Sequence, residues 1–152
     1  MADKNKPDAA LKPLDALVGK WVSELRLNDG KTKTDFHIIG TDTYYWHPGK
    51  FFLVHDVDVR MEGEPYQVTE FIGGYDKTTQ TYPMRSFDSQ GNFQTMQASV
   101  DNEGIWIFAG ETTRATLTIA QDGITMQAHW EQTQDGKKWS PWMDMKFTRI
   151  RY

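Results

Sequence analysis

The sequence predicts an all-β protein: a single antiparallel up-and-down β-barrel of about ten strands, with a short N-terminal helix closing one end. The first observation is that apolar and polar residues alternate from Phe51 to Arg149 with the two-residue period of half-buried strands. The second is the presence of tight turns, of which Asp122-Gly123 and Asp135-Gly136 are the clearest. Asp-Gly pairs readily take the positive φ angles of a two-residue hairpin loop. Consecutive hairpins in this order favour an up-and-down barrel.

The two Asp-Gly turns set registers that place apolar residues opposite one another. In the first hairpin the predicted pairs are Ile119 with Met126, Leu117 with Ala128, and Ala115 with Trp130. In the second hairpin they are Trp130 with Pro141, Ala128 with Met143, and Met126 with Met145. A slip of one residue would turn all of these side chains to the other face, so the register is strongly specified.

The elements are expected in the following order. Residues 1–8 are polar and are expected to form a disordered tail, followed by one barrel domain over residues 9–152. From Ala9 to Val18 the leucines recur at helical spacing with Asp8 as a cap, so one short helix should end before Gly19. The predicted strands, ten or eleven depending on whether 42–47 counts, are 20–28, 32–40, 42–47, 50–61, 65–75, 80–88, 92–101, 104–110, 112–121, 123–134 and 139–151.

Composition excludes several classes of function. The formal net charge is −4 and the basic residues are scattered, so nucleic acid and anionic membranes are poor partners. The absence of cysteine excludes disulfides, thiolate nucleophiles and cysteine-ligated metals. The first residues lack the apolar core of a signal peptide, and no segment reaches the roughly 20 apolar residues that span a bilayer. We expect a soluble cytoplasmic protein without membrane insertion; its oligomeric state stays open, a homodimer included.

Segment 50–61 predicts which face of the strands points inward. Val57, Val59 and Met61 alternate there with charged residues, so odd-numbered residues should face the interior. Turns near 101–104 and 110–111 would place Trp106 opposite Ser99 and Ala115, and Phe108 opposite Gln97 and Thr113. The predicted inner wall is Trp21, Leu25, Leu53, His55, Val57, Trp106, Phe108, Leu117, Met126, Trp130, Met143, Met145 and Phe147. Since eight strands are just filled by side chains, about ten leave room for a ligand-sized cavity.

His55 is the sharpest candidate for chemistry, because it lies on an otherwise apolar inner face. If the turn at Gly63-Glu64 sets the next hairpin, His55 lies opposite Phe71 or Ile72, with Glu70 as a diagonal neighbour. Alternation leaves two registers open: either Glu70 shares the inner side with His55, or Phe71 is inside and Glu70 is in solvent.

Arg85 carries the same ambiguity, because it points inward only if Phe87 does. A cluster of His55, Glu70 and Arg85 could act as an acid–base machinery, anchor the polar end of a ligand, or be a satisfied buried network. No catalytic residue is assigned among these candidates. The other histidines, His37, His47 and His129, are expected at the surface or rim, and no pair has metal-ligand spacing, so no metal site is expected.

Gly19-Lys20-Trp21, placed after the short helix, resembles the Gly-x-Trp opening of the calycins. This superfamily comprises lipocalins, fatty-acid-binding proteins and nitrobindins. In calycins that Trp plugs one end of the barrel, and a basic residue of the last strand packs across it. The resemblance therefore implies that Trp21 and Arg149 form a structural plug.

The whole chain looks more closely like an uncharacterised bacterial family of small lipocalin-like barrels, known only as a domain of unknown function. The matching motifs are Leu14-x-x-Leu17-x-Gly19-x-Trp21, Gly74-Tyr75-Asp76 with Tyr82, Asp88-Ser89-Gln90-Gly91, and Asp135-Gly136-x-x-Trp139 before Thr148-Arg149. This resemblance covers most of the chain and implies a fold without an established activity.

Two better-known relatives do not match at their ligand sites. Fatty-acid-binding proteins end in an Arg-x-Tyr that grips a carboxylate, whereas Tyr152 is displaced by one residue from that spacing. Nitrobindins carry glycines after their Trp and a haem-binding His near the chain end, and this sequence has neither. The sequence therefore argues against haem, and no cofactor is expected.

The expected function is binding of a small, mainly hydrophobic molecule inside the barrel. The residues expected to bind it are Leu53, His55, Val57, Glu70, Arg85, Trp106, Phe108, Leu117, Met126, Trp130, Met143 and Met145. One alternative is an enzyme that acts on a small hydrophobic substrate with His55, Glu70 and Arg85. Another is a protein–protein interaction module that uses the outward-facing Trp46 and Trp142.

Overall fold

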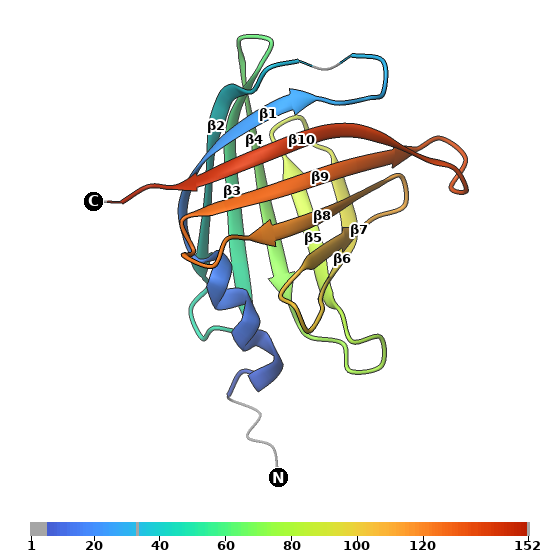
Figure 1. Ribbon diagram of the computed structural model, residues 1–152. Helices are drawn as coiled ribbons and strands as arrows, with labels where there is room; N and C mark the ends of the chain where they lie inside the picture. The colour runs from blue at the N-terminus through green and yellow to red at the C-terminus, as the bar shows by residue number, and fades with distance from the viewer. Residues whose placement is uncertain (1–5, 33, 152) are drawn as a thin grey trace.

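The chain folds as a closed barrel of ten antiparallel strands with a short N-terminal helix (Figure 1). The computed structural model describes residues 6–32 and 34–151, so residues 1–5 of the expected tail and Tyr152 lie outside the described residues. The elements are η1 (Ala9–Leu17), β1 (Gly19–Leu27), β2 (His37–Trp46), β3 (Phe52–Met61), β4 (Glu64–Gly73), β5 (Tyr82–Asp88), β6 (Phe93–Val100), β7 (Trp106–Ala109), β8 (Thr113–Ile119), β9 (Thr125–Thr133) and β10 (Trp139–Arg149). Strands pair in chain order and β1 closes against β10, which confirms the up-and-down barrel.

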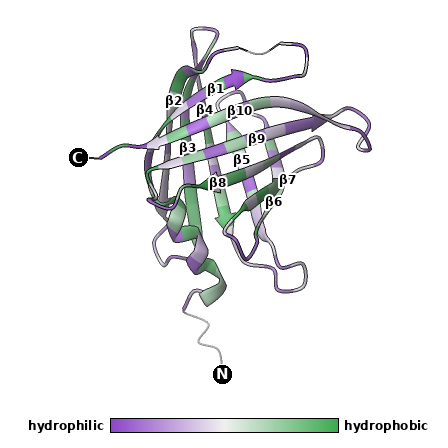
Figure 2. Cartoon of the chain, in the orientation of Figure 1, coloured by the Kyte–Doolittle hydropathy of each residue, from purple (hydrophilic) through white to green (hydrophobic). Residues whose placement is uncertain are grey.

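Alternating hydropathy along the strands separates the inside of the barrel from its outside (Figure 2). In β9, Met126 and Ala128 are buried, whereas Gln127 and His129, the residues that follow each of them, are exposed. Each strand buries one face in this way, and closure of the sheet leaves no unpaired edge. Among the described residues, no helix is long and apolar enough to cross a membrane.

The N-terminal segment forms a 3₁₀ helix rather than an α-helix. Its buried residues, Leu11, Leu14 and Leu17, recur every third position, which aligns them on one side of a helix with three residues per turn. Asp8 caps the helix by accepting a hydrogen bond from the backbone N–H of Ala10 at 2.9 Å, as expected. The leucines close one end of the barrel, where the Tyr82 hydroxyl donates to the Ala10 carbonyl at 2.6 Å.

Trp21 and Arg149 meet at this closed end, as the calycin resemblance implies. They are register partners on β1 and β10, and the Arg149 guanidinium lies 4.1 Å above the centre of the fully buried Trp21 ring. The Trp21 indole N–H donates to the Leu17 carbonyl at 3.0 Å, and Arg149 donates to the carbonyls of Val18 and Gly123. The helix, the first strand and the last strand are thus joined through one tryptophan.

The predicted hairpin registers hold for one Asp-Gly turn and shift for the other. Across β8 and β9, the pairs Ile119–Met126, Leu117–Ala128 and Ala115–Trp130 are confirmed. Across β9 and β10, the predicted partners are wrong by two residues: Met126 faces Phe147, Ala128 faces Met145 and Trp130 faces Met143. A longer loop, with Thr133 opposite Trp139, and a bulge between Pro141 and Met143 produce the shift. A shift of two residues keeps the same side chains inside.

Two further registers differ from expectation. Trp106 faces Val100 and Leu117, and Phe108 faces Ala98 and Ala115, instead of the predicted partners. The reason on the β6 side is Asp101, whose backbone N–H donates to the Ile105 carbonyl while its carboxylate accepts from the backbone N–H of Glu103 and Ile105. These bonds stabilise a β6–β7 loop whose length shifts the pairing of β6 with β7 by one residue from the predicted register.

The segments predicted as strands 32–40 and 42–47 form one strand, β2, which begins only at His37. Gly40, in the middle of β2, does not form a turn. A Cβ atom at that position would lie 2.0 Å from the backbone oxygen of Asp58 on β3, so glycine permits close approach of the two strands. The ladder between β1 and β2 is irregular between Ser23 and Glu24 beside it.

Candidate functional site

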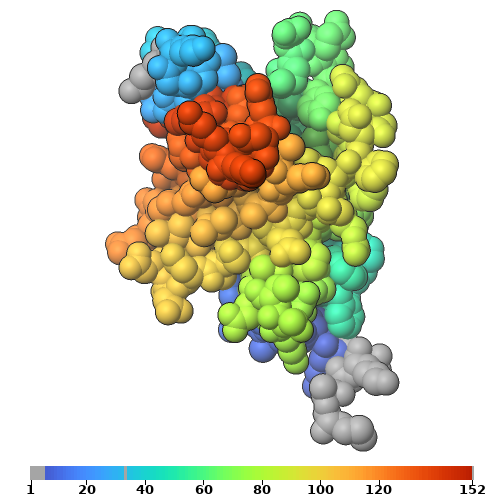
Figure 3. Space-filling model, turned by 90° about the vertical axis from the view of Figure 1, so that its right-hand side faces the viewer, coloured from blue at the N-terminus to red at the C-terminus, as the bar shows by residue number. Residues whose placement is uncertain are grey.

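The barrel encloses a cavity of about 280 Å³ toward the end opposite the helix. Figure 3 shows this end of the molecule notched between the β1–β2 connection and the β3–β4 turn. Eight of the twelve residues expected to bind a ligand line the cavity: His55, Val57, Glu70, Phe108, Leu117, Trp130, Met143 and Met145. The lining is thus mostly aliphatic, aromatic and thioether in character, which suits an irregular apolar molecule.

The other four expected residues lie elsewhere. Leu53, Trp106 and Met126 point inward but belong to the packed core between the cavity and the helix, where each is at most 2% exposed. Arg85 lies on the outer face, exposed and paired in register with Phe71. Its neighbours Met84 and Ser86 take the inner positions, so Arg85 does not join His55 and Glu70.

His55 bridges two carboxylates on the cavity wall. Its Nε2 lies 2.7 Å from Asp42 Oδ2, and its Nδ1 lies 3.2 Å from Glu70 Oε1. Tyr44 stacks on the imidazole with ring centres 3.9 Å apart and an interplanar angle of 8°. We call Asp42, His55 and Glu70 the polar triad.

Strand register explains why these residues meet. His55 on β3 lies directly opposite Tyr44 on β2 and Glu70 on β4, and Asp42 lies two residues along β2 on the same face. The β3–β4 turn has positive φ at Glu62 and Gly63, one residue earlier than predicted, so Glu70 and not Phe71 or Ile72 faces His55. Of the two registers left open by the sequence, the one with Glu70 inside is therefore correct.

The charge state of His55 follows from competition between burial and its two partners. Burial alone would lower the pKa of the imidazole, since it penalises the charged form. The hydrogen bonds and charges of Asp42 and Glu70 outweigh burial and raise the pKa of His55 to about 9. At neutral pH the ring is therefore an imidazolium, and both of its N–H groups donate to carboxylates.

Asp42 lines the cavity and belongs to the polar triad, but the sequence analysis did not identify it as a candidate. It is only 4% exposed, yet it is the first residue of the predicted strand 42–47, for which the sequence predicts no inward face. A signal was available, because Asp42, Tyr44 and Trp46 alternate with outward residues in one uninterrupted run. Ser86 and Gln94, which line the cavity, were also missed and carry no sequence signal that sets them apart.

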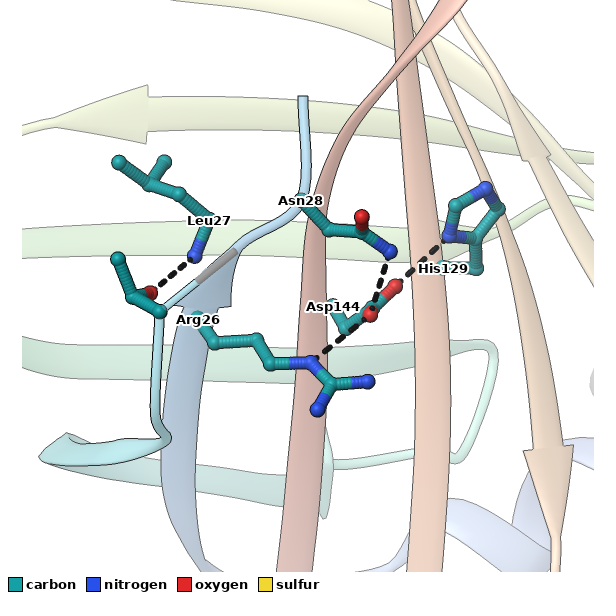
Figure 4. A network of polar contacts seen from close by, with 6 residues as sticks. Arg26, Leu27, Asn28, His129 and Asp144 are labelled. Atoms are coloured by element: carbon teal, nitrogen blue, oxygen red, sulfur yellow. Dashed lines mark hydrogen bonds and ion pairs between the residues drawn. The ribbon is translucent and has the colours of Figure 1, made fainter. Parts of the chain in front are cut away.

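A second polar cluster lies on the outside of the barrel (Figure 4). Asp144 on β10 accepts from Arg26 Nε at 3.0 Å and from Asn28 Nδ2 at 3.0 Å, and it lies 2.8 Å from Nδ1 of His129. Burial opposes ionisation of Asp144, but these partners outweigh it and lower the pKa of the carboxyl. The contacts of Asp144 with Arg26 and His129 join β1, β9 and β10, and the Arg26 guanidinium also lies over the Phe36 ring. His129 is half exposed and His37 and His47 are exposed, as predicted.

Among the described residues, no group of three or more His, Asp or Glu side chains is placed to hold a metal ion.

Comparisons with known proteins found a matching family model and similar solved structures. A family model described as "Protein of unknown function (DUF1579)" matches residues 6–149. Among solved structures, the crystal structure of Rv2717c from M. tuberculosis is similar, with a TM-score of 0.61 and 15% sequence identity over 96% of this chain and 100% of that chain. At this identity the likeness concerns the fold alone. No curated protein matches in sequence.

Proposed function

The chain belongs to the DUF1579 family of proteins of unknown function, and from the geometry of its barrel we propose that it binds a small, mainly hydrophobic molecule in the barrel cavity. The observation that carries this proposal is the cavity itself, an apolar space with a polar triad on one wall. Such a combination of apolar lining and a few placed polar groups is typical of ligand sites. The kinship with lipocalins, fatty-acid-binding proteins and nitrobindins is part of the proposal, supported by Trp21 beneath Arg149.

The size of the cavity limits the ligand. At about 280 Å³ it lies just below the range of roughly 300–1,000 Å³ typical of small-molecule pockets. Leu53 and Trp106, which lie between the cavity and the helix, are buried in the core. A medium-length alkyl chain or a single aromatic ring system fits this space better than a long-chain fatty acid or haem.

The contacts of the polar triad favour binding over catalysis. A general base needs a free lone pair, but His55 at neutral pH is protonated and donates both N–H groups to Asp42 and Glu70. Arg85, the third expected member of an acid–base cluster, lies outside the barrel.

The two tryptophans predicted to face outward, Trp46 and Trp142, do not favour a docking module. For Trp46 the predicted facing is wrong, because it lies on the same face of β2 as Asp42 and Tyr44 and packs against the core. The Trp46 indole N–H donates to Asp15 at 2.8 Å, and Trp142 packs edge-on against Trp130. Both rings are thus engaged by contacts within the chain.

Fluorescence titration with 1-octanol tests the proposal, because Trp130 on the cavity wall should report occupancy. The wild-type protein should show a saturable change in tryptophan emission, and native mass spectrometry should show a one-to-one adduct. Ala128→Phe fills the cavity and should abolish the change, whereas Gln127→Phe, the neighbouring outward position, should keep it. Circular dichroism checks that both variants are folded. A wild-type protein that shows no saturable change, or a folded Ala128→Phe variant that binds octanol normally, contradicts the proposal.

A further inference from the structure

We infer that the cavity selects a ligand whose polar end is a cationic hydrogen-bond donor, such as a primary ammonium group on a small hydrophobic body, and that it rejects carboxylates. This inference rests on the proposed function, and it concerns which chemical class of small hydrophobic molecule the cavity takes.

The cavity wall carries a net negative charge. Among the described residues, the acidic and basic side chains that line it are Asp42, Glu70 and His55, with no Lys or Arg. Even with His55 charged, two carboxylates and one imidazolium leave a net charge of −1 on the wall. In a site of low effective dielectric this charge attracts an ammonium group and repels a carboxylate more strongly than in water.

The hydrogen bonds of the polar triad leave acceptors, and not His55 donors, available to a ligand. Both N–H groups of His55 are already directed at Asp42 and Glu70, so the imidazolium has no donor left for an anionic ligand. The carboxylates keep acceptor capacity. Asp42 Oδ1 is buried without a hydrogen-bond partner among the described residues, and Glu70 bonds His55 through Oε1 alone. An unsatisfied buried acceptor is unfavourable, and a donor on the ligand would relieve it.

The same wall also carries aromatic side chains. Tyr44, Phe108 and Trp130 line the cavity, and aromatic faces attract cations through their quadrupoles. The phenol of Tyr44 adds no negative charge, because burial and then the charges of Asp42 and Glu70 raise its pKa further above its usual value. The same carboxylate charges that oppose ionisation of Tyr44 would act favourably on a ligand cation.

The test compares three probes of equal chain length at pH 7: octylamine, 1-octanol and sodium octanoate, each titrated into the wild-type protein by calorimetry. We expect octylamine to bind at least tenfold more tightly than octanoate, with octanol between them. Equal affinities, or tightest binding of octanoate, overturn this inference while leaving the proposed function in place. Failure of all three probes to bind counts against the proposed function itself.

Two matched variants locate the selectivity on the triad. Glu70→Gln removes one negative charge from the wall at constant size and should reduce the octylamine-to-octanoate affinity ratio at least tenfold. Glu64→Gln removes the same charge from an exposed position on the same strand and should leave the ratio unchanged. A folded Glu70→Gln protein with the wild-type ratio would overturn the inference. If that variant does not fold, the three-probe series on the wild-type protein still decides the question.

Discussion

Raising the pH through the titration of His55 should destabilise the protein. The pKa of this imidazole is about 9 in the folded chain against an ordinary value of 6.5. A group whose folded pKa is raised stabilises fully below its unfolded pKa, and this contribution is lost as the pH rises through the folded pKa. The window in which stability falls is therefore pH 6.5 to about 9.

The size of the effect follows from the same two values. Each unit of difference between the folded and the unfolded pKa corresponds to about 1.4 kcal/mol of unfolding free energy. The rise from 6.5 to about 9 therefore gives about 3 kcal/mol of unfolding free energy that depends on the His55 proton. His55 is only 13% exposed in its side chain, so screening by solvent reduces this value little. Deprotonation would leave Asp42 and Glu70 on the wall with no charged partner between them.

Urea denaturation at pH 6, 7.5 and 9 measures this contribution directly. The wild-type unfolding free energy should fall by about 3 kcal/mol across the window, and His55→Gln should remove most of that fall. His37→Gln, a change of the same chemistry at an exposed position, should retain it. A flat wild-type profile, or a His55→Gln profile that still falls like the wild type, would refute the assignment of a charged imidazolium held by two carboxylates.

Two further predictions concern the framework of the barrel. Trp21→Ala removes the fully buried ring between the helix and Arg149 and should lower the unfolding free energy by about 3–5 kcal/mol in chemical denaturation; a loss below about 1 kcal/mol would show that the ring is no core plug. Gly40→Ala introduces a Cβ against the backbone of Asp58 and should cost about 1–3 kcal/mol, measured in the same way. An unchanged stability of that variant would mean that β2 and β3 do not approach closely at Gly40.

Some of the register could be predicted because it is encoded locally. Asp122-Gly123 lies directly between β8 and β9, and Gly123 takes the positive φ that this turn requires, so the predicted pairs across the hairpin hold. The β9–β10 turn looked equivalent in sequence. There the Asp135 carboxylate accepts from the backbone N–H of Lys137 and Lys138, which stabilises a longer loop. A side chain bonding to the following backbone competes with the tight turn, and a residue motif alone does not show which will form.

In the candidate site, too, some residues could be placed from the sequence and others could not. Alternation alone placed His55, Val57 and Trp130 on an inner wall, because a period of two residues is a property of each strand by itself. Glu70 and Arg85 could not be placed from alternation, since both faces of their strands carry apolar residues. Their positions depend on a turn one residue earlier than expected and on pairing between strands, which puts Glu70 opposite His55 and turns Arg85 outward. The polar triad exists only because β2, β3 and β4 align at one level of the closed barrel, and that alignment depends on ladders between strands, not on the pattern within any one of them.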